Sequence, residues 1–405
     1  MGQVVDAAVV DRMVAMRRDL HQYPELSWQE HKTAERISSA LHELGIAHHR
    51  LLGTGVVADL PGEEGLPAVA LRADIDALPI QEETGLPFAS TNEGVMHACG
   101  HDGHTSMLLG AAELLVRGGD LPAPVKLIFQ PAEEEGAGAN ALIEAGVLES
   151  VGVIFGGHLD RHFFTGTLVV APGPGSASTD YFTIRVTGRG GHAARPHETI
   201  DAVVVGSLIV TAIQTIVSRE IDPSDPSIVT IGRFEAGSAP NVIAGQAELE
   251  GTIRAQSPKV REHLKKSIRR VAESIGQLHQ AYLEIELTEG SPPIVNTPGA
   301  TTLAYQAAVA IAGEKRVRRH WRVTMGGEDF ANYLLSVPGC YIRIGARPST
   351  DQGFPAHSSR FDFDEAALSI GASWMAEVAR RAGAALESGE LDSLDRFEEV
   401  DEDES

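Results

Sequence analysis

The chain has 405 residues, enough for two or three domains of ordinary size, and its composition is that of a globular protein. Its formal charge is -23, from 56 acidic and 33 basic residues, which argues against nucleic-acid binding. We expect neither a signal peptide nor a membrane-spanning segment, and the chain contains only two cysteines, Cys99 and Cys340. These features predict a cytoplasmic protein with reduced cysteines and no membrane partner.

Helices and strands alternate in the first part of the chain, which is typical of an α/β fold. Ser27 and Glu30 match a capping box, so we expect one helix to begin there and to end at Gly45. This order of elements predicts a doubly wound sheet, with ligands beyond the carboxyl ends of its strands. The other expected helices cover residues 6–20, 104–116 and 138–145, and the expected strands cover 69–73, 125–129 and 153–155.

The pattern changes after a stretch rich in glycine, proline and serine at residues 171–178. The order β-α-β-β-α-β follows, which predicts a ferredoxin-like module over residues 180–289. A further buried strand is expected at residues 340–345. The expected strands of the module cover 181–187, 228–234, 247–253 and 282–288, and its helices cover 199–218 and 257–277.

The densest cluster of reactive side chains lies at residues 97–104, which hold one thiol, three imidazoles and one carboxylate. Cysteine and histidine close together are typical metal ligands. A loop with a buried cysteine and surface histidines is the alternative interpretation. Asp74 and Asp76 directly follow an expected strand, and they favour the metal site.

Two further strands are expected to end in polar residues. Three adjacent carboxylates, Glu133 to Glu135, follow the strand at 125–129, and they repel one another unless a cation is near. A metal hydrolase needs one carboxylate as a ligand and another for proton transfer, although a solvated acidic turn is also compatible. His158 follows the strand at 153–155. Three strands that end in Asp, Glu and His side chains are expected to share one crevice.

The order of these motifs resembles that of the M20 metallopeptidase family, in the amidohydrolase branch with hippurate hydrolases, N-acyl-amino-acid amidohydrolases and auxin-conjugate hydrolases. The resemblance covers about residues 10–380. It implies a doubly wound catalytic domain interrupted by an α+β, ferredoxin-like lid domain that carries a dimer contact. The matching motifs are 72–79, 97–104, 130–134, 190–197, 251–254, 325–330 and 357–359. The expected domains are a catalytic domain of residues 1–179 and 290–384, a lid of residues 180–289, and an acidic tail of residues 385–405.

The resemblance also implies roles for single residues. Two divalent ions per subunit (Zn, Mn, Co or Ni) would be held by Cys99, His101, Glu134, His158 and His357. Glu133 would be the general base, and Asp76 would orient a metal ligand.

Three residues of the lid domain are implied in substrate binding. His192 would polarise the scissile carbonyl, in some relatives from the partner subunit, and Asn241 and Arg254 would lie near the substrate carboxylate. Taken alone, His192 could cap a turn, Asn241 could form an Asx-turn, and Arg254 could be a surface residue.

The implied reaction is hydrolysis of the amide bond of an N-acyl amino acid, such as an N-acetyl or N-benzoyl compound, to a carboxylic acid and a free amino acid. A dipeptidase or a carbamoyl-amino-acid hydrolase is an alternative, and a non-catalytic metal-binding relative is a remote one. The presence of Glu133 with all five ligand candidates argues against the last. The expected partners are this small substrate and a second copy of the chain. Arg161 stands where relatives often have proline, so the walls of the substrate pocket are expected to differ.

Overall fold

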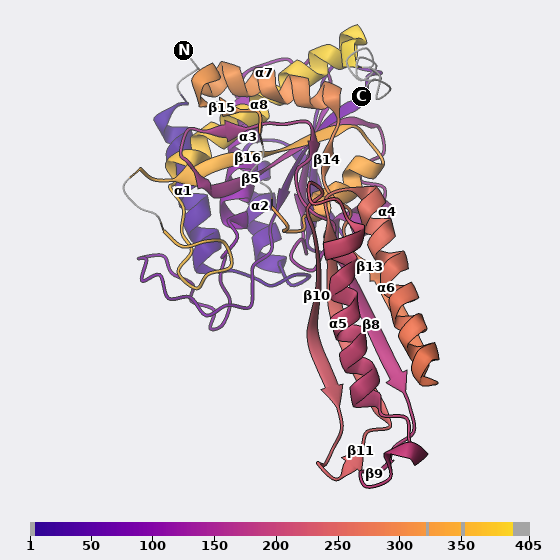
Figure 1. The fold of residues 1–405 in the computed structure, drawn as a ribbon. Helices are drawn as coiled ribbons and strands as arrows, with labels where there is room; N and C mark the ends of the chain where they lie inside the picture. Colours follow the sequence, from indigo (N-terminus) through magenta and orange to yellow (C-terminus); the bar gives the residue numbers. More distant parts are fainter. Residues whose placement is uncertain (1–4, 321–323, 350–352, 392–405) are drawn as a thin grey trace. The chain divides into compact units, whose positions relative to one another are not determined.

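The computed structural model describes residues 5–320, 324–349 and 353–391. The chain forms two compact units (Figure 1). Unit 1 comprises Met1–Gly173, Val295–Arg322 and Asp329–Ser405, and unit 2 comprises Pro174–Ile294 and Val323–Glu328. Unit 1 is therefore discontinuous in sequence. The short strands β7 (Gly173–Pro174) and β14 (Val295–Asn296) lie where the chain leaves unit 1 and enters it again. The predicted acidic tail falls largely at residues 392–405, outside the described residues.

Unit 1 contains an eight-stranded mixed sheet with the order β1-β2-β4-β3-β5-β16-β6-β15. Its central strands β4, β3, β5 and β16 are parallel, whereas β1 and β2 are antiparallel to their neighbours. All seven residues of β3 are buried, as expected for the centre of a covered parallel sheet. The strands are β1 Ala47–Leu51, β2 Gly55–Leu60, β3 Ala68–Asp74, β4 Val125–Gln130, β5 Val151–Phe164, β6 Leu168–Val169, β15 Val317–Arg318 and β16 Gly339–Arg347.

Helix α3 packs against both α1 and α8, and α8 also packs against α7. Gly110 allows this close packing, since a Cβ there would lie 2.2 Å from the sulfur of Met13 on α1. Trp374 of α8 is fully buried and donates a hydrogen bond to the carbonyl of Ala304 on α7 at 3.1 Å. The helices are α1 Ala7–Gln22, α2 His31–Glu43, α3 His101–Arg117, α4 Gly138–Glu144, α7 Pro298–Ala312 and α8 Ala366–Ser388, with 3₁₀ turns η2 Glu314–Arg316 and η3 Asp329–Leu335.

The predicted capping box at the start of α2 is wrong. The side chain of Glu30 makes no cap hydrogen bond, and Ser27 lies outside the helix. The carboxylate of Glu25 caps the first turn instead, at 2.8 Å from the amide nitrogen of Thr33. Trp28 has a φ of +64°, and this turn separates Ser27 from the helix start.

Strand β5 is longer than the sequence predicts, so His158 lies within the strand and not after it. Gly156 and Gly157 look like a strand end in the sequence, but the pairing of β5 with β16 continues through Asp160. A Cβ at Gly156 would lie 2.8 Å from the ring of Tyr341 on β16. The glycine is therefore explained by close packing on the neighbouring strand.

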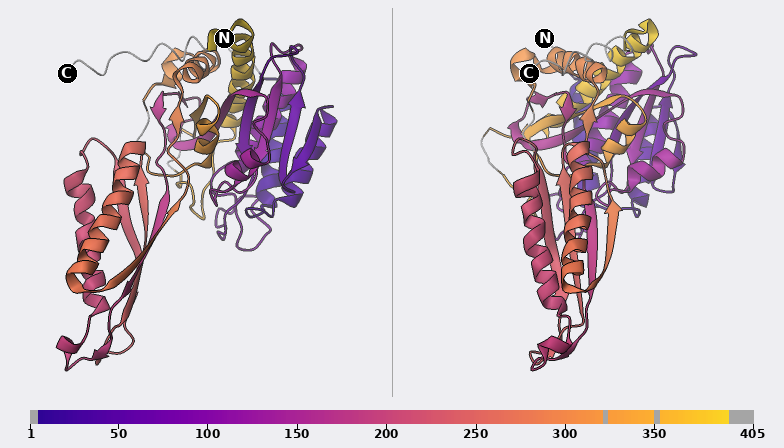
Figure 2. Two further views of the ribbon diagram at one scale, coloured as in Figure 1. Left: turned by 90° about the vertical axis from the view of Figure 1, so that its right-hand side faces the viewer. Right: turned by 45° about the vertical axis from the view of Figure 1, so that its right-hand side comes forward.

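Unit 2 contains a four-stranded antiparallel sheet with the order β10-β12-β8-β13. Figure 2 (left) shows α5 and α6 together on one face of this sheet. The predicted α/β fold with a ferredoxin-like β-α-β-β-α-β module is confirmed. The elements are β8 Asp180–Thr187, α5 Ala202–Glu220, β10 Ser227–Ala236, β12 Gln246–Ala255, α6 Pro258–His279 and β13 Tyr282–Glu289, with the short strands β9 Gly191–His192 and β11 Val242–Ile243 and the 3₁₀ turn η1 Pro196–Glu198.

Helix α5 is, within the described part of the chain, the one helix long and apolar enough to span a membrane. This differs from the sequence analysis, which expects no such segment. Ile209 and Ile213 on one side of α5 are fully buried in the core of unit 2. Val204 and Leu208 on another side are 47% and 41% exposed. One side of α5 thus belongs to the core of unit 2, and another presents apolar residues on its surface.

Candidate metal centre and catalytic site

The predicted donors come together in unit 1 at the carboxyl ends of parallel strands. β3 ends at Asp74 and is followed by Asp76. β4 leads into the turn that carries Glu133 and Glu134. β5 pairs with β3 and carries His158. Because neighbouring parallel strands end at one edge of the sheet, side chains far apart in the sequence meet there.

A turn at Gly100 places Cys99 and His101 at the start of α3. Gly100 has a φ of +99°, a left-handed conformation that glycine adopts without a steric penalty. Donor atoms of Cys99, His101 and His158 lie within 4.8 Å of one another. These three residues form one compact donor group.

Hydrogen bonds fix the orientation of both histidine rings in this group. Nδ1 of His101 lies 2.9 Å from the backbone oxygen of Asp76 and 3.2 Å from its carboxylate. A carbonyl oxygen only accepts, so Nδ1 carries the proton and, in the neutral ring, Nε2 keeps the lone pair. Nδ1 of His158 likewise donates to the carbonyl of Leu159 at 2.7 Å, and its Nε2 lies 3.3 Å from Sγ of Cys99. Both rings therefore present Nε2 to the donor group.

The turn with the two glutamates is attached to the same carboxylate that orients His101. The amide of Glu134 donates to Oδ2 of Asp76 at 3.0 Å. Oε2 of Glu133 and Oε1 of Glu134 lie 3.9 and 3.8 Å from Nε2 of His101. Asp76 thus sets the relative position of a histidine and the glutamates beside it.

His357 reaches the site from a distant part of the sequence. Its φ is +67°, which is unusual for a residue with a Cβ, and its amide donates at 2.7 Å to the carbonyl next to Cys99. Nε2 of His357 lies 3.4 Å from Oε1 of Glu134. Donor atoms of Cys99, Glu134 and His357 form a second group within 4.8 Å. Cys99 therefore belongs to two donor groups, the other with His101 and His158.

The chemistry of this donor set fits a divalent cation. Nε2 of His101 and Oε1 of Glu134 are buried and make no hydrogen bond to any described residue, which is costly for polar atoms. Burial and the charge of Glu134 raise the pKa of Cys99 to about 12, so binding as a thiolate requires a cation that displaces the proton. Burial opposes a charged ring at His101, yet Asp74 raises its pKa well above the usual value. The cluster attracts positive charge.

Another histidine of the cluster, His104, has both ring nitrogens in hydrogen bonds, so neither is available to a metal ion. Its Nδ1 donates to Asp74 at 2.6 Å, and its Nε2 accepts the amide of Leu159 at 2.9 Å. The buried Arg72 donates to Asp74 at 2.7 Å and to Gln130 at 2.8 Å. The sequence favours a metal site near Asp74, but it assigns no individual role to His104, Arg72 or Gln130. What could have identified them in the sequence is their position, either near the end of an expected strand or within the motif of residues 97–104.

A buried arginine fixes the start of α3 from the side of α1. Arg17 is 1% exposed, and its Nε donates to Oδ2 of Asp102 at 3.0 Å. Nδ1 of His21 lies 2.8 Å from the same oxygen. Arg17 also donates to Asp362 at 2.8 Å and to Glu365 at 3.2 Å. Segments from both ends of the chain are thereby joined to the helix that begins at the candidate metal site.

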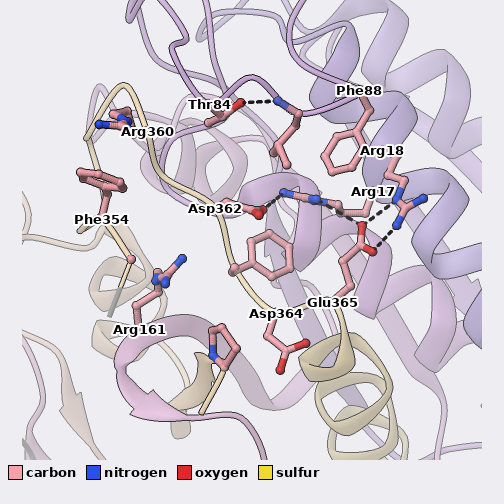
Figure 3. Close-up of a pocket in the computed structure, with 14 residues that line it drawn as sticks. Arg17, Arg18, Thr84, Phe88, Arg161, Phe354, Arg360, Asp362, Asp364 and Glu365 are labelled. Carbon is pink, nitrogen blue, oxygen red and sulfur yellow. Dashed lines mark hydrogen bonds and ion pairs between the residues drawn. The ribbon is translucent and has the colours of Figure 1, made fainter. Parts of the chain in front are cut away.

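Arg17 also lines a pocket of about 470 Å³ in unit 1 (Figure 3). On one side of the pocket Arg17 is paired with Glu365. Elsewhere the guanidinium of Arg360 lies over the ring of Phe354, at 4.5 Å from its centroid, and Arg161 is close by. Arg161, the residue at which the sequence analysis expects a difference from relatives, lines this pocket. Basic and acidic groups are interspersed there, so the lining favours no single sign of charge.

The three predicted residues of unit 2 do not form one cluster. His192 on β9 and Asn241 before β11 are neighbours, since the carbonyl of Asn241 accepts the amide of Ala193 at 3.2 Å. Both side chains are exposed. Arg254 lies near the end of β12 and donates to the carbonyl of Met325 at 2.9 Å. It lies eight residues beyond the start of β12, roughly 26 Å of strand, whereas β9 and β11 lie near that start.

Comparisons with known proteins agree on one family. A model described as peptidase family M20/M25/M40 matches residues 70–381. The chain is 42% identical to the N-acetylcysteine deacetylase of Bacillus subtilis over 379 residues, which cover 93% of this chain and 98% of the relative. It is 40% identical to thermostable carboxypeptidase 1 of Saccharolobus solfataricus over 372 residues, which cover 90% and 93% of the two chains. It also resembles the crystal structure of the Bacillus subtilis YXEP protein, a dinuclear metal-binding peptidase from the M20 family, with a TM-score of 0.82, 39% identity and coverage of 92% and 98%.

Proposed function

Since the chain belongs to peptidase family M20/M25/M40, we propose that it is a metal-dependent amidohydrolase that cleaves N-acyl amino acids to a carboxylic acid and a free amino acid. The observation that carries this proposal is the pair of donor groups that share Cys99. Glu133 adjoins them, with Oε2 at 3.9 Å from Nε2 of His101. Glu133 itself lies in a donor group with His101 and Glu134. In this proposal its carboxylate serves proton transfer and not metal binding.

The residues that would hold two divalent ions are those of the two groups. Cys99, His101 and His158 would hold one ion, and Cys99, Glu134 and His357 would hold the other. Thiolate, imidazole and carboxylate ligands suit Zn, Mn, Co or Ni. When bound, such ions supply Lewis acidity towards a water molecule and towards the scissile carbonyl.

Glu133 is the group that we assign to proton transfer. Its carboxylate would accept a proton from the attacking water and deliver it to the leaving amine. Glu134, the adjacent residue, would serve as a ligand, because its Oε1 is buried and lacks a hydrogen-bond partner among the described residues. Asp76 would keep the two roles separate by holding both the ring of His101 and the amide of Glu134.

In this proposal unit 1 is the catalytic domain, and unit 2 is a lid that also forms a homodimer. The exposed apolar residues Val204 and Leu208 of α5 favour a contact between two lids. Strand β10 is at an edge of the sheet of unit 2, which leaves its outer backbone groups for such a contact.

A dimer would also account for the distance within unit 2 between Arg254 and the two neighbours His192 and Asn241. Arg254 would bind the substrate carboxylate in one subunit. His192 and Asn241, at the other end of the sheet, would reach the site of the partner. There His192 would stabilise the charge that develops on the carbonyl oxygen.

Peptide substrates are the second candidate, because the chain is also similar to a thermostable carboxypeptidase. A carbamoyl-amino-acid substrate is a third. All three classes present an amide-type bond next to an amino acid, so the donor groups and Glu133 would serve each of them.

Release of free amine from a panel of N-acetyl and N-benzoyl amino acids, dipeptides and carbamoyl amino acids tests the proposal. The protein is stripped with a chelator and then supplied with Mn²⁺, Zn²⁺ or Co²⁺. We expect metal-dependent release of amine from N-acyl amino acids. If protein that binds two ions hydrolyses no N-acyl amino acid, the proposed reaction is wrong. Glu133→Gln is expected to abolish turnover and to retain both ions. Loss of metal in this variant would show that the roles of Glu133 and Glu134 are wrongly assigned.

We also propose a cytoplasmic location. Cys99 and Cys340 are both free and buried, which suits a reducing compartment.

A further inference from the structure

Ser27 and Glu30 have the spacing of a helix cap in the sequence, but in the structure both contact the region proposed to be catalytic. Glu30 is fully buried, and its carboxylate has no part in capping α2, which Glu25 caps instead. Oε1 of Glu30 accepts the amide of Ala132 at 2.9 Å. Oγ of Ser27 donates to Oδ2 of Asp76 at 2.8 Å.

Ala132 directly precedes Glu133, and its backbone is strained. It has a φ of +54°, in the left-handed region, and no exposed surface. Residues with a Cβ avoid this region because the Cβ crowds the following carbonyl oxygen. The hydrogen bond to Glu30 therefore holds a turn whose intrinsic preference is to relax.

The segment of residues 27–30 also contacts the other side of this turn, through Asp76. Oδ2 of Asp76 accepts both the hydroxyl of Ser27 and the amide of Glu134. Glu133 thus lies between two backbone attachments, one at Ala132 and one at Glu134. The side chains of residues 27 and 30 stabilise both attachments.

We propose that Glu30 is a positioning residue, which holds the left-handed turn at Ala132 and thereby aims Glu133 and Glu134 at the metal site. The proposal rests on the function proposed above for those two glutamates. Burial raises the pKa of Glu30 to about 7, but the contact does not depend on charge. Oε1 remains an acceptor when the proton is carried by the other oxygen.

Four variants separate positioning from a general loss of stability. Glu30→Gln keeps an acceptor for the amide of Ala132, whereas Glu30→Ala removes it. Ala132→Gly removes the conformational cost of the turn, because glycine populates positive φ freely. The fourth is the double variant Glu30→Ala/Ala132→Gly. Glu35→Ala is the matched control, since Glu35 is an exposed glutamate on α2.

Each variant is measured for kcat and KM on the best substrate of the panel, for Co²⁺ affinity by the thiolate-to-cobalt absorption band, and for thermal unfolding. In Glu30→Ala we expect kcat and Co²⁺ affinity to fall by about 10- to 100-fold, with little change in KM. Glu30→Gln is expected to stay near the wild type, and the double variant to recover most of the lost kcat. Where Glu30→Ala is too unstable to purify, Glu30→Gln is compared with the double variant.

Equal kcat and Co²⁺ affinity in Glu30→Ala and the wild type would overturn the proposal. So would an equal loss in Glu30→Gln and Glu30→Ala, or a double variant that recovers nothing. The Co²⁺ measurement separates this test from that of the proposed reaction. If no N-acyl amino acid is hydrolysed but Glu30→Ala still weakens Co²⁺ binding, the positioning role stands and the reaction is wrong.

Discussion

Histidine 21 is expected to make the stability of unit 1 depend on pH in the alkaline range. Its Nδ1 lies 2.8 Å from Asp102 and its Nε2 lies 3.3 Å from Glu82, and the ring has no exposed surface. Burial opposes the charged ring, but the two carboxylates outweigh it and raise the pKa of His21 from 6.5 to about 9. The protonated ring therefore stabilises the folded state.

The size and sign of the effect follow from this shift. The contribution of His21 is fully present below pH 6.5, the value for the unfolded chain, and it is lost as the pH rises through about 9. At 1.36 kcal/mol per pH unit, the difference corresponds to about 3 kcal/mol of unfolding free energy. Since Arg17 also pairs with Asp102, this carboxylate keeps a partner after His21 loses its proton.

Urea unfolding at several pH values between 6 and 9.5 measures this contribution. Tryptophan fluorescence is the signal from unit 1, because the sequence of unit 2 contains no tryptophan. His21→Gln should lack the His21 component of the pH dependence, so its difference from the wild type should shrink as the pH rises. His42→Gln, an exposed histidine on α2, is the control and should follow the wild type. Parallel pH profiles of His21→Gln and the wild type would refute the reasoning.

Three further changes test other parts of the structure. Cys99→Ala removes the donor common to both groups and should lower the affinity for both ions by more than about 10-fold in a chelator competition, and a loss confined to one ion would contradict the shared role. Arg17→Met leaves Asp102 and its neighbours without their main cation and should cost about 3–5 kcal/mol of unfolding free energy in urea, so a cost below about 1 kcal/mol would contradict this estimate. Leu208→Asp puts a charge on the exposed side of α5 and should yield monomers in light scattering, with a matching fall in activity. Full activity as a monomer would show that His192 and Asn241 of a partner are not needed.

The sequence predicts the parts of the site whose residues are close together in the chain. Cys99 and His101 share one short motif, and Glu133 and Glu134 share another, so their types and spacing alone indicate metal chemistry. His357 could be placed only by resemblance, because its neighbours in space are far away in sequence. Arg17 had no signal at all, since its partners Asp102 and Glu365 lie 85 and 348 residues from it.

Two errors of the sequence analysis have a common physical origin. Ser27 and Glu30 have the spacing of a capping box, but tertiary contacts use both side chains elsewhere. Gly156 is usually a sign of a strand end, but here it makes room for the ring of Tyr341. In both places the local pattern is ordinary, and packing against a distant segment determines the outcome.

The discontinuity of unit 1 has a consequence for the way the chain is made. Strand β5 pairs with β3 on one side, but its other partner, β16, is synthesised only after unit 2. At 5–20 residues per second, the segment Pro174–Ile294 alone takes about 6–24 s to translate. During this time the edge of β5 has no partner from its own sheet, and unpaired edges promote aggregation. The nascent chain thus passes through a vulnerable interval before His357 exists. With His357 as a ligand, as proposed, metal loading is complete only after the synthesis of almost the whole protein.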